Sequence, residues 1–333
     1  AGYHAVKKIR ELDKEGCIDV YSNTGRAPYN PMLTTYYAFG KLEYEGMFPF
    51  GDLEQIQKEV DFNLRREQVI KVHGSEHLVE TENGSEQYDR ILIATGARAF
   101  APPVKGLEPE DAFLMRTVED ALRFKDRLKK NDIKHAVVIG ASMAGIKVVE
   151  VLHKYGIETW LLDLASYIFP LAAYKEVAKE IEKRVEAQGV HLMFGVTIDH
   201  MEQENGEKVA VLTDGSRIPA DIVGLCIGTR AITETVQGEV EIGRGIVVDD
   251  HMRTSVPGIY AAGDCCEGNN LESGQNQIIG LWANANHQGE TAGINMAGGD
   301  MAYKGNILHN ITHFMNMDFI GFGDNRMQGE VLE

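Results

Sequence analysis

Small residues and one carboxylate stand between residues 136 and 163 at the spacing of a phosphate-binding turn. The stretch reads AVVIGASMAGIKVVEVLHKYGIETWLLD, with Gly140, Ser142 and Gly145 in the turn and Asp163 at the end. Small residues let the backbone approach a pyrophosphate, whose charge the N–H groups at the start of the next helix bind. The carboxylate accepts hydrogen bonds from ribose hydroxyls and repels a 2′-phosphate. The pattern predicts a dinucleotide site that prefers NAD to NADP.

The beginning of the chain repeats the second half of this pattern. The first 23 residues read AGYHAVKKIRELDKEGCIDVYSN and place Gly2 at the position of Gly145, and Asn23 at that of Asp163. An amide at this position can bond a ribose hydroxyl, but it carries no charge. The repeat predicts a second dinucleotide site. Because the chain opens partway through this copy, we expect a longer native polypeptide that supplies the first strand and glycines.

The elements around both turns follow one plan. A strand, the turn, an amphipathic helix and a second strand are predicted for the complete copy. Each copy is followed by an antiparallel meander with Asn-Gly or Asp-Gly turns, at 69–81 and at 197–213. Each half then ends in an apolar strand that enters a Thr/Gly turn. Two such halves predict two homologous nucleotide-binding domains.

Apolar spacing predicts three further helices, at 117–130, 175–188 and 282–296. The residues expected to face inward in the first two are Leu122, Phe124 and Leu128, and Val177, Ile181 and Val185. Residues 99–115 contain two prolines and indicate a linker. The residues from 303 onward alternate like a strand.

The overall composition limits the classes of partner. The chain has 333 residues, 33 Lys and Arg against 50 Asp and Glu, and a net charge of −17. This excess of negative charge argues against nucleic acid and anionic membranes as partners. The longest apolar run is interrupted by Gly, Ser and Lys, so no membrane span is expected.

The four cysteines predict neither a metal site nor a disulfide framework. They are Cys17, Cys226, Cys265 and Cys266, and their spacing fits neither pattern. We expect Cys17 and Cys226 to lie in the core. Reducing, cytoplasmic conditions fit this cysteine usage best.

Three further motifs give the chain a family resemblance. They are ATGAR at 94–98, IYAAGDC at 259–265 and LWANANHQGETAGINMAGG at 281–299. With the two glycine turns, and in this order, they make the chain similar to the FAD- and NAD(P)H-dependent pyridine nucleotide–disulfide oxidoreductases. The resemblance covers essentially the whole chain. It is closest to the branch of NADH oxidases, coenzyme A disulfide reductases, nitrite reductase flavin domains and rubredoxin reductases.

The resemblance implies an α/β fold with two Rossmann-like dinucleotide-binding domains. The FAD-binding domain would comprise residues 1–110 and 245–300, and the NAD-binding domain residues 111–244. Residues 301–333 would begin a C-terminal α+β interface domain, which in a complete chain supports a homodimer.

The resemblance also assigns cofactor-binding residues. FAD would be held by Gly2, Asn23, Thr95, Gly96, Gly263, Asp264 and Ala283. Asp264 would accept hydrogen bonds from the ribityl hydroxyls. The helix that starts at Trp282 would direct its N–H groups at the flavin pyrimidine ring, where negative charge develops on reduction. NADH would be held by Gly140, Ser142, Gly145 and Asp163, with Gly228 lining the nicotinamide side.

The segment Arg26–Leu42 carries no cysteine, although many members of the family have one or two there. Met32 and Thr34 occupy this neighbourhood and, with Trp282, are the flavin-facing candidates. Without a thiolate there is no nucleophile for a disulfide or a peroxide. We therefore expect electrons to pass from NADH through FAD to a protein or small-molecule acceptor, such as a small redox protein or partner subunits.

The sequence departs from the family pattern at two further positions. Lys147 stands where many relatives have a glutamate that helps to organise the nicotinamide site, and Pro31 replaces a common arginine. A non-catalytic, flavoprotein-like subunit of a larger redox complex is one alternative, motivated by Asn23, Lys147 and the first turn that the chain does not show. An NADH oxidase that forms peroxide is another, because a reduced flavin reacts with oxygen without help.

Overall fold

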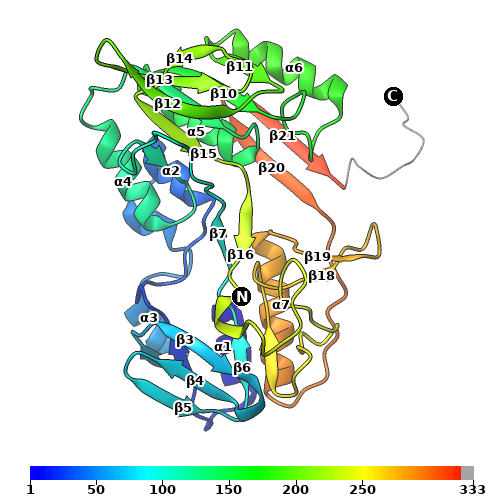
Figure 1. The fold of residues 1–333 in the computed structure, drawn as a ribbon. Coiled ribbons are helices and arrows are strands. Elements are labelled where there is room, and N and C mark those ends of the chain that lie inside the picture. Colours follow the sequence, from blue (N-terminus) through cyan, green and yellow to red (C-terminus); the bar gives the residue numbers. More distant parts are fainter. Residues whose placement is uncertain (324–333) are drawn as a thin grey trace. The chain divides into compact units, whose positions relative to one another are not determined.

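A computed structural model describes residues 1–323, which form two compact units. Unit 1 comprises Ala1–Tyr29, Phe48–Arg98 and Arg230–Leu308. Unit 2 comprises Asn30–Met47, Ala99–Thr229 and the described residues from His309 on. Both units are therefore assembled from three separate stretches of chain, which the colours of Figure 1 make visible.

Unit 2 is built on a five-stranded parallel sheet with the strand order β11-β10-β9-β15-β8. Its strands are β8 (Ala112–Phe113), β9 (His135–Ile139), β10 (Glu158–Asp163), β11 (His191–Phe194) and β15 (Ile222–Leu225). An antiparallel meander joins it, formed by β12 (Ile198–Glu204), β13 (Glu207–Leu212) and β14 (Arg217–Pro219). Its helices are α2 (Leu33–Phe39), α4 (Val118–Leu128), α5 (Met143–Lys154) and α6 (Lys175–Glu186), with a 3₁₀ turn η1 at Tyr44–Met47.

Both faces of this sheet are covered, as its apolar strands require. In β9, Val138 faces the core shared with α4, α5 and α6, while Val137 and Ile139 face the meander. Figure 1 shows helices α5 and α6 beside the sheet and the strands of the meander on its other side. The sheet thereby holds the end of β9, where the glycine turn begins, in a fixed place.

Unit 1 carries two parallel strand pairs, β1–β2 and β6–β17, and the antiparallel meander β3-β4-β5. The strands are β1 (Asp19–Tyr21), β2 (Asn63–Arg65), β3 (Val69–His73), β4 (Leu78–Thr81), β5 (Gly84–Gln87), β6 (Ile91–Ile93) and β17 (Ile259–Ala261). A short hairpin pairs β18 (Gly268–Asn269) with β19 (Asn276–Gln277). The helices are α1 (Gly2–Leu12), α3 (Leu53–Glu59) and α7 (Trp282–Met296), with 3₁₀ turns η2 (Gly74–Glu76) and η3 (Glu234–Val236).

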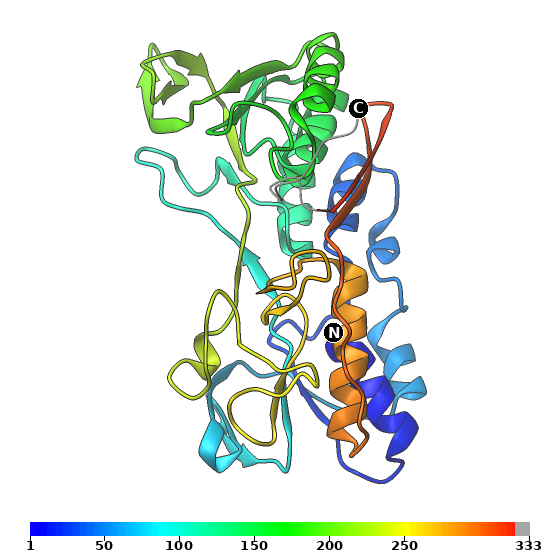
Figure 2. The ribbon, with the colours of Figure 1, turned by 90° about the vertical axis from the view of Figure 1, so that its right-hand side faces the viewer.

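Helices α1 and α7 pack closely because α7 presents glycines to α1. A methyl group on Gly293 would lie 2.5 Å from the carbonyl oxygen of Ala5, and one on Gly289 would lie 2.3 Å from that of Ala1. Only hydrogen side chains permit this approach of two backbones. Figure 2 shows the two helices side by side.

The strands β7 (Ala97–Ala99) and β16 (Thr229–Ala231) pair with each other where the chain passes between the units. In unit 2 the last described strands are β20 (His309–Phe314) and β21 (Met317–Phe322), which form an antiparallel hairpin. Its inner face buries Phe314 and Phe319 against Phe169. The hairpin is therefore part of the core of unit 2.

The structure corrects three details expected from the sequence. In α6 the buried positions are Ala178, Ile181 and Val185, while Val177 is 48% exposed, because the buried stripe follows an i, i+3, i+7 spacing. Cys17 is exposed and accepts a hydrogen bond from Asn63 instead of lying in the core. The expected linker contains the edge strand β8, which pairs with β15.

Candidate functional site

The glycine turn of unit 2 is too tight for any side chain at two positions. Gly140 has φ +104°, and a methyl group there would lie 2.3 Å from the carbonyl oxygen of Cys226. A methyl group on Gly145 would lie 1.9 Å from the carbonyl oxygen of Gly140. The turn therefore needs glycine at both ends, as the sequence predicts.

Ser142 is the N-cap of α5. Its hydroxyl accepts a hydrogen bond from the N–H of Gly145 (3.3 Å) and donates one to the carbonyl of Cys226 (3.0 Å). A serine thus replaces the middle glycine and adds a link between the turn and the end of β15. No local pattern of residues indicates this link, because Cys226 lies far along the chain.

The turn lies at the topological switch point of the sheet. From β9 the chain proceeds to β10 and β11 on one side, whereas β15 and β8 lie on the other. In open parallel sheets, dinucleotides bind in the crevice at the carboxyl ends of the strands at this point. The N-terminus of α5 adds the positive end of its dipole there. The residues of this turn therefore fit a pyrophosphate.

Asp163 ends β10, and both of its carboxylate oxygens accept hydrogen bonds from the backbone. Oδ2 accepts from the N–H of Ala141 (2.7 Å), and Oδ1 accepts from the N–H of Ala165 (2.8 Å). A carboxylate has further lone pairs, so a ribose hydroxyl can still donate to it. Asp163 consequently supports the turn in addition to its predicted contact with ribose.

Two further backbone positions adjoin the glycine turn of unit 2 (residues 140–145), the coenzyme turn. Gly228 follows β15 with φ +105°, and its carbonyl accepts from the N–H of Phe100 (2.9 Å). Phe169, in the loop after Asp163, donates its N–H to the carbonyl of Ala141 (2.9 Å) at φ +56°. A buried aromatic residue with positive φ is a backbone outlier of the kind found at functional sites. Nothing in the sequence around Phe169 indicates this backbone conformation.

In unit 1 the predicted FAD residues meet at the starts of α1 and α7. A methyl group on Gly2 would lie 3.6 Å from the Cβ of Ala94, just beyond β6. One on Gly263, just beyond β17, would lie 3.1 Å from the Cβ of Ala1 and 3.7 Å from that of Ala285. Strands β6 and β17 run parallel, so their carboxyl ends, and Asp264 beyond β17, share one edge. Two helix N-termini beside two strand ends fit the diphosphate and ribityl parts of FAD.

The residues predicted to bind the adenosine half of FAD lie on loops after strands. Thr95 donates its hydroxyl to the carbonyl of Ile232 (2.6 Å), and Gly96 has φ +69° with open space at its α-carbon. Asn23 is exposed after β1, and its amide nitrogen donates to Gln68 (2.8 Å). Open space at Gly96 fits a close approach of FAD to the backbone.

The start of α7 carries a stack of aromatic rings. Trp282 stacks on Phe50 with ring centroids 5.7 Å apart, and Phe50 stacks on Tyr3 at 4.3 Å. Ala283 is exposed in the first turn of α7. The sequence identified Trp282 and Ala283 but not Phe50, which only the fold brings beside them.

The other two flavin-facing candidates lie in unit 2, around α2. Met32 is its N-cap and is 47% exposed, whereas Thr34 is fully buried and donates its hydroxyl to the carbonyl of Pro31 (2.6 Å). Thr34 therefore holds the start of α2, and of these two Met32 is the more accessible. Their role toward FAD stays a prediction.

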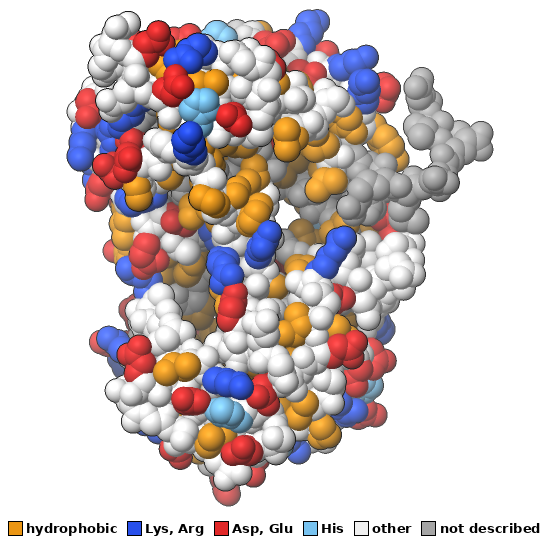
Figure 3. Space-filling model, in the orientation of Figure 1, with side chains coloured by type: hydrophobic (Ala, Val, Ile, Leu, Met, Phe, Trp, Pro, Cys, Tyr) orange, Lys and Arg blue, Asp and Glu red, His pale blue; other side chains and the backbone are white. Residues whose placement is uncertain are grey.

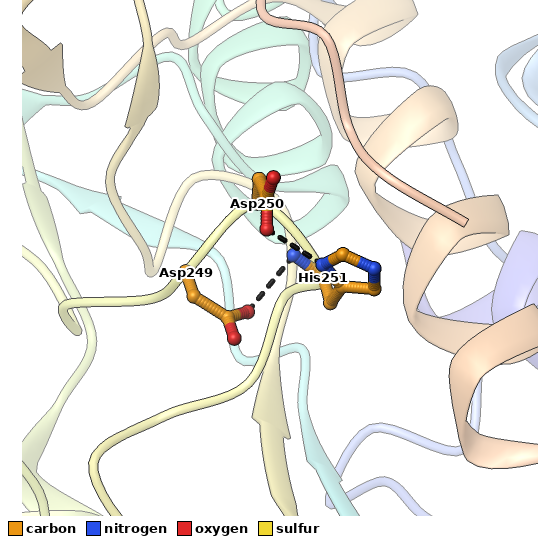
Figure 4. Close-up of side chains that lie close together, drawn as sticks. All are labelled: Asp249, Asp250 and His251. Carbon is orange, nitrogen blue, oxygen red and sulfur yellow. Dashed lines mark hydrogen bonds and ion pairs between the residues drawn. The ribbon is translucent and has the colours of Figure 1, made fainter. Parts of the chain in front are cut away.

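One group in residues 1–323 has the spacing of a possible metal site: Asp249, Asp250 and His251, drawn in Figure 4. The ring of His251 is hydrogen-bonded to Asp250 (2.6 Å) and to Asp300 (2.8 Å), and both acidic residues of the group are exposed. These bonds explain the arrangement as a loop anchor.

The thiols of Cys265 and Cys266 are fully buried and donate to the carbonyls of Ile93 and Gly263, respectively.

With the two sites described, the comparison with known proteins is decisive at the level of family. Residues 1–289 match the pyridine nucleotide-disulphide oxidoreductase family. The chain belongs to this family. Its membership confirms the predicted α/β dinucleotide-binding fold, an oxidoreductase enzyme, and FAD and NADH as the cofactors of the group.

Individual relatives are distant but nearly full-length matches to the chain. The epsilon subunit of the NADH-dependent phenylglyoxylate dehydrogenase of Aromatoleum evansii is 28% identical to this chain. The match covers 100% of this chain and 79% of the relative. An NADH oxidase of Methanocaldococcus jannaschii is 28% identical, and the match covers 90% of this chain and 68% of the oxidase. The structure of reduced Bacillus anthracis CoADR-RHD is 27% identical with a TM-score of 0.91. It is matched over 98% of this chain and 60% of its own length.

Within residues 1–323, no helix has the length and apolar character needed to cross a bilayer. Figure 3 shows acidic and basic side chains interspersed over the face in view. On that face the excess of acidic residues is not gathered into one patch.

Proposed function

We propose that the protein is an NADH-dependent flavoprotein that passes electrons to an acceptor without an active-site thiol. The observation that carries the proposal is the coenzyme turn of unit 2, where the close contacts of Gly140 and Gly145 and the hydrogen-bonded carboxylate of Asp163 fit a dinucleotide. The family membership and the FAD-type strand ends of unit 1 support the second cofactor. FAD, when bound, accepts hydride from NADH and releases the electrons onward.

The residues of the chain have binding and orienting roles in this reaction. Gly140, Ser142 and Gly145 would hold the pyrophosphate of NADH, and Asp163 its adenosine ribose. Gly2, Gly263 and Asp264 would hold the diphosphate and ribityl chain of FAD. Orientation of two bound cofactors supplies most of the rate in such a reaction, so no general acid has to be assigned.

We infer that the acceptor is a protein. The absence of cysteine from Arg26 to Leu42 removes the thiol that disulfide and peroxide reduction require. Similarity to the epsilon subunit of a larger dehydrogenase supports partner subunits as the acceptor. Similarity to an NADH oxidase supports molecular oxygen as the second candidate.

An anaerobic titration tests the proposal. The purified protein is reconstituted with FAD, and NADH is added while the flavin absorbance is recorded. We expect stoichiometric bleaching, with NADPH much less effective. Failure to bind FAD, or bound flavin that NADH does not bleach, would contradict the proposal and favour a non-catalytic subunit. Reoxidation is then compared between oxygen and an oxidised ferredoxin, and fast reoxidation by oxygen alone would identify an oxidase.

A further inference from the structure

A buried lysine of α5 has no part in the coenzyme site described above. Lys147 stands two residues after Gly145, and its side chain is only 3% exposed. Its ammonium donates to the carboxylate of Glu150, one turn later, and to the carbonyl oxygen of His313 (2.8 Å). It also lies 4.6 Å from the ring centroid of Tyr36 on α2, at cation–π distance. Lys147 thus contacts three elements of unit 2.

Glu150 extends the same network. Its side chain is 8% exposed; one oxygen accepts from Lys147, and the other accepts from the N–H of Met315 (3.1 Å) and lies 3.3 Å from the ammonium of Lys41. Burial opposes its charge, yet the hydrogen bond from Lys147 and the charge of Lys41 keep the pKa of Glu150 below its usual value. The carboxylate is therefore ionised at neutral pH, and both of its oxygens have partners.

The network joins elements that differ in their predicted roles. Helix α5 begins at the coenzyme turn. Helix α2 has Met32 as its N-cap and contains Thr34, the two flavin-facing candidates of unit 2, and Lys41 follows its C-cap. Strand β20 supplies His313, and the turn between β20 and β21 supplies Met315. Figure 1 shows α2, α5 and β20 in neighbouring positions within unit 2.

Stability alone is a weak reason for such an arrangement. A buried ion pair gives little net stability over apolar residues of the same volume, because both charges lose their hydration. Burial lowers the pKa of Lys147, because the loss of hydration disfavours its charged form. In contrast, hydrogen bonds with fixed directions hold elements in one register. The arrangement is better explained as a device that holds α2 and β20 in place on α5.

We propose that Lys147 is a positioning residue that, with Glu150, clasps α2 and the β20–β21 turn onto the helix that begins at the coenzyme turn. The flavin-facing candidates would then keep a fixed place relative to the NADH site. This inference rests on the proposed function for its effect on the reaction. The clasp itself does not require a bound cofactor.

The first test measures amide hydrogen exchange in the protein without added cofactors. The variants are Lys147→Met, the charge-free pair Lys147→Met with Glu150→Leu, and Lys179→Met as a control on the exposed face of α6. We expect at least tenfold faster exchange in Leu33–Phe39 and at Met315 in both clasp variants, and no change in the control. Unchanged exchange in these two segments would overturn the clasp.

The second test separates positioning from plain stability. We expect Lys147→Met to lower the unfolding temperature because Glu150 loses its main partner, and the charge-free pair to recover it. With FAD bound, the limiting rate of flavin bleaching by NADH should fall at least tenfold in both, with little change in the dissociation constant of NADH. If the rate recovers together with the unfolding temperature, Lys147 is only structural. Wild-type flavin that NADH does not bleach would instead refute the proposed function.

Discussion

At Gly145 there is no room for one additional carbon atom, because a methyl group would lie 1.9 Å from the carbonyl oxygen of Gly140. Alanine at this position must displace the turn or the start of α5. We expect Gly145→Ala to weaken NADH binding at least tenfold and to cost about 1–3 kcal/mol of stability, as overpacking does. Calorimetric titration with NADH and thermal unfolding measure the two effects.

Gly224 provides a matched control in the same unit. A methyl group there would lie 3.5 Å from the nearest methyl groups of Val138 and Val148, which is an ordinary contact. Gly224→Ala should leave NADH binding within about twofold of the wild type, since small volume changes that fit the core are tolerated. Equal effects of the two substitutions would show that the close contact at Gly145 is unimportant.

Asp163 offers a second prediction at this scale, because it serves the backbone as well as the ribose. Asp163→Ala removes an ionised acceptor, a loss of about 1.5–3 kcal/mol for a hydrogen bond to a charged group. We expect a KM for NADH raised about tenfold or more, a lower unfolding temperature and weaker discrimination against NADPH. A KM that rises without any loss of stability would contradict the contacts with Ala141 and Ala165.

His251 predicts a pH dependence of stability. Its hydrogen bond to Asp250, and then that to Asp300, raise the pKa of His251 above its usual value. A raised pKa stabilises the folded state fully below the unfolded pKa of about 6.5, and this contribution is lost as the pH rises through the folded pKa. The difference in unfolding temperature between wild type and His251→Gln should therefore be largest near about pH 5.5 and shrink toward about pH 9.

Removal of one of the two ring partners, Asp300, supplies the control for this measurement. Asp300→Asn should reduce the same pH-dependent difference without abolishing it, because Asp250 still holds the ring. A difference that does not vary with pH would show that the ring bonds of His251 to Asp250, drawn in Figure 4, and to Asp300 add nothing to stability.

Which residues could be predicted from the sequence depends on how local their signal is. The turn residues Gly140, Ser142 and Gly145 are recognisable because one short stretch contains strand, turn and helix. Phe50 and Cys226 carry no such mark, since long-range folding alone places a ring beside Trp282 and a carbonyl against the turn. The positive φ of Phe169 is likewise invisible in its own sequence.

At the scale of elements, the contact between α1 and α7 depends on two glycines of one helix face. Gly293→Ala would place a methyl group 2.5 Å from the carbonyl oxygen of Ala5, so the helices must separate. Because both helices begin at the predicted FAD site, we expect a lower unfolding temperature and less retained FAD. The flavin-to-protein absorbance ratio measures the retention.

His287 lies exposed on the same helix and gives the comparison. His287→Ala changes an exposed side chain without adding volume, and surface changes are usually within about 0.5 kcal/mol. FAD retention should match the wild type. Loss of flavin in this variant too would mean that α7 tolerates no change, and would leave the glycine contact unsupported.

Helices and strands were predictable where the spacing of apolar residues was regular over many residues. Helix α7 matches its predicted range, and β9, α5 and β10 appear in the predicted order. The inward face of α6 was misplaced because Val177 is apolar yet exposed, whereas the smaller Ala178 is buried. Strand β8 escaped prediction because its two residues follow a proline-rich stretch and gain their pairing only from the distant β15.

The two compact units, each with one predicted dinucleotide site, should respond separately to ligands. Binding stabilises the part of the structure that makes the contacts. We expect NAD⁺ to slow hydrogen exchange in β9, α5 and β10 of unit 2, and FAD to slow it in α1, β17 and the start of α7 of unit 1. Protection of the same segments by both ligands would contradict the assignment of one cofactor to each unit.

The interleaving of the two units in the chain constrains how the protein is made. Strand β6 ends at Ile93, but its partner β17 begins only at Ile259, so the two strands cannot pair until the chain beyond Ile259 has left the ribosome. Pairing between such distant segments is slow, and the waiting strand exposes apolar residues meanwhile. Nascent chains of this protein should therefore depend on chaperones, and neither unit can be produced as one uninterrupted gene fragment.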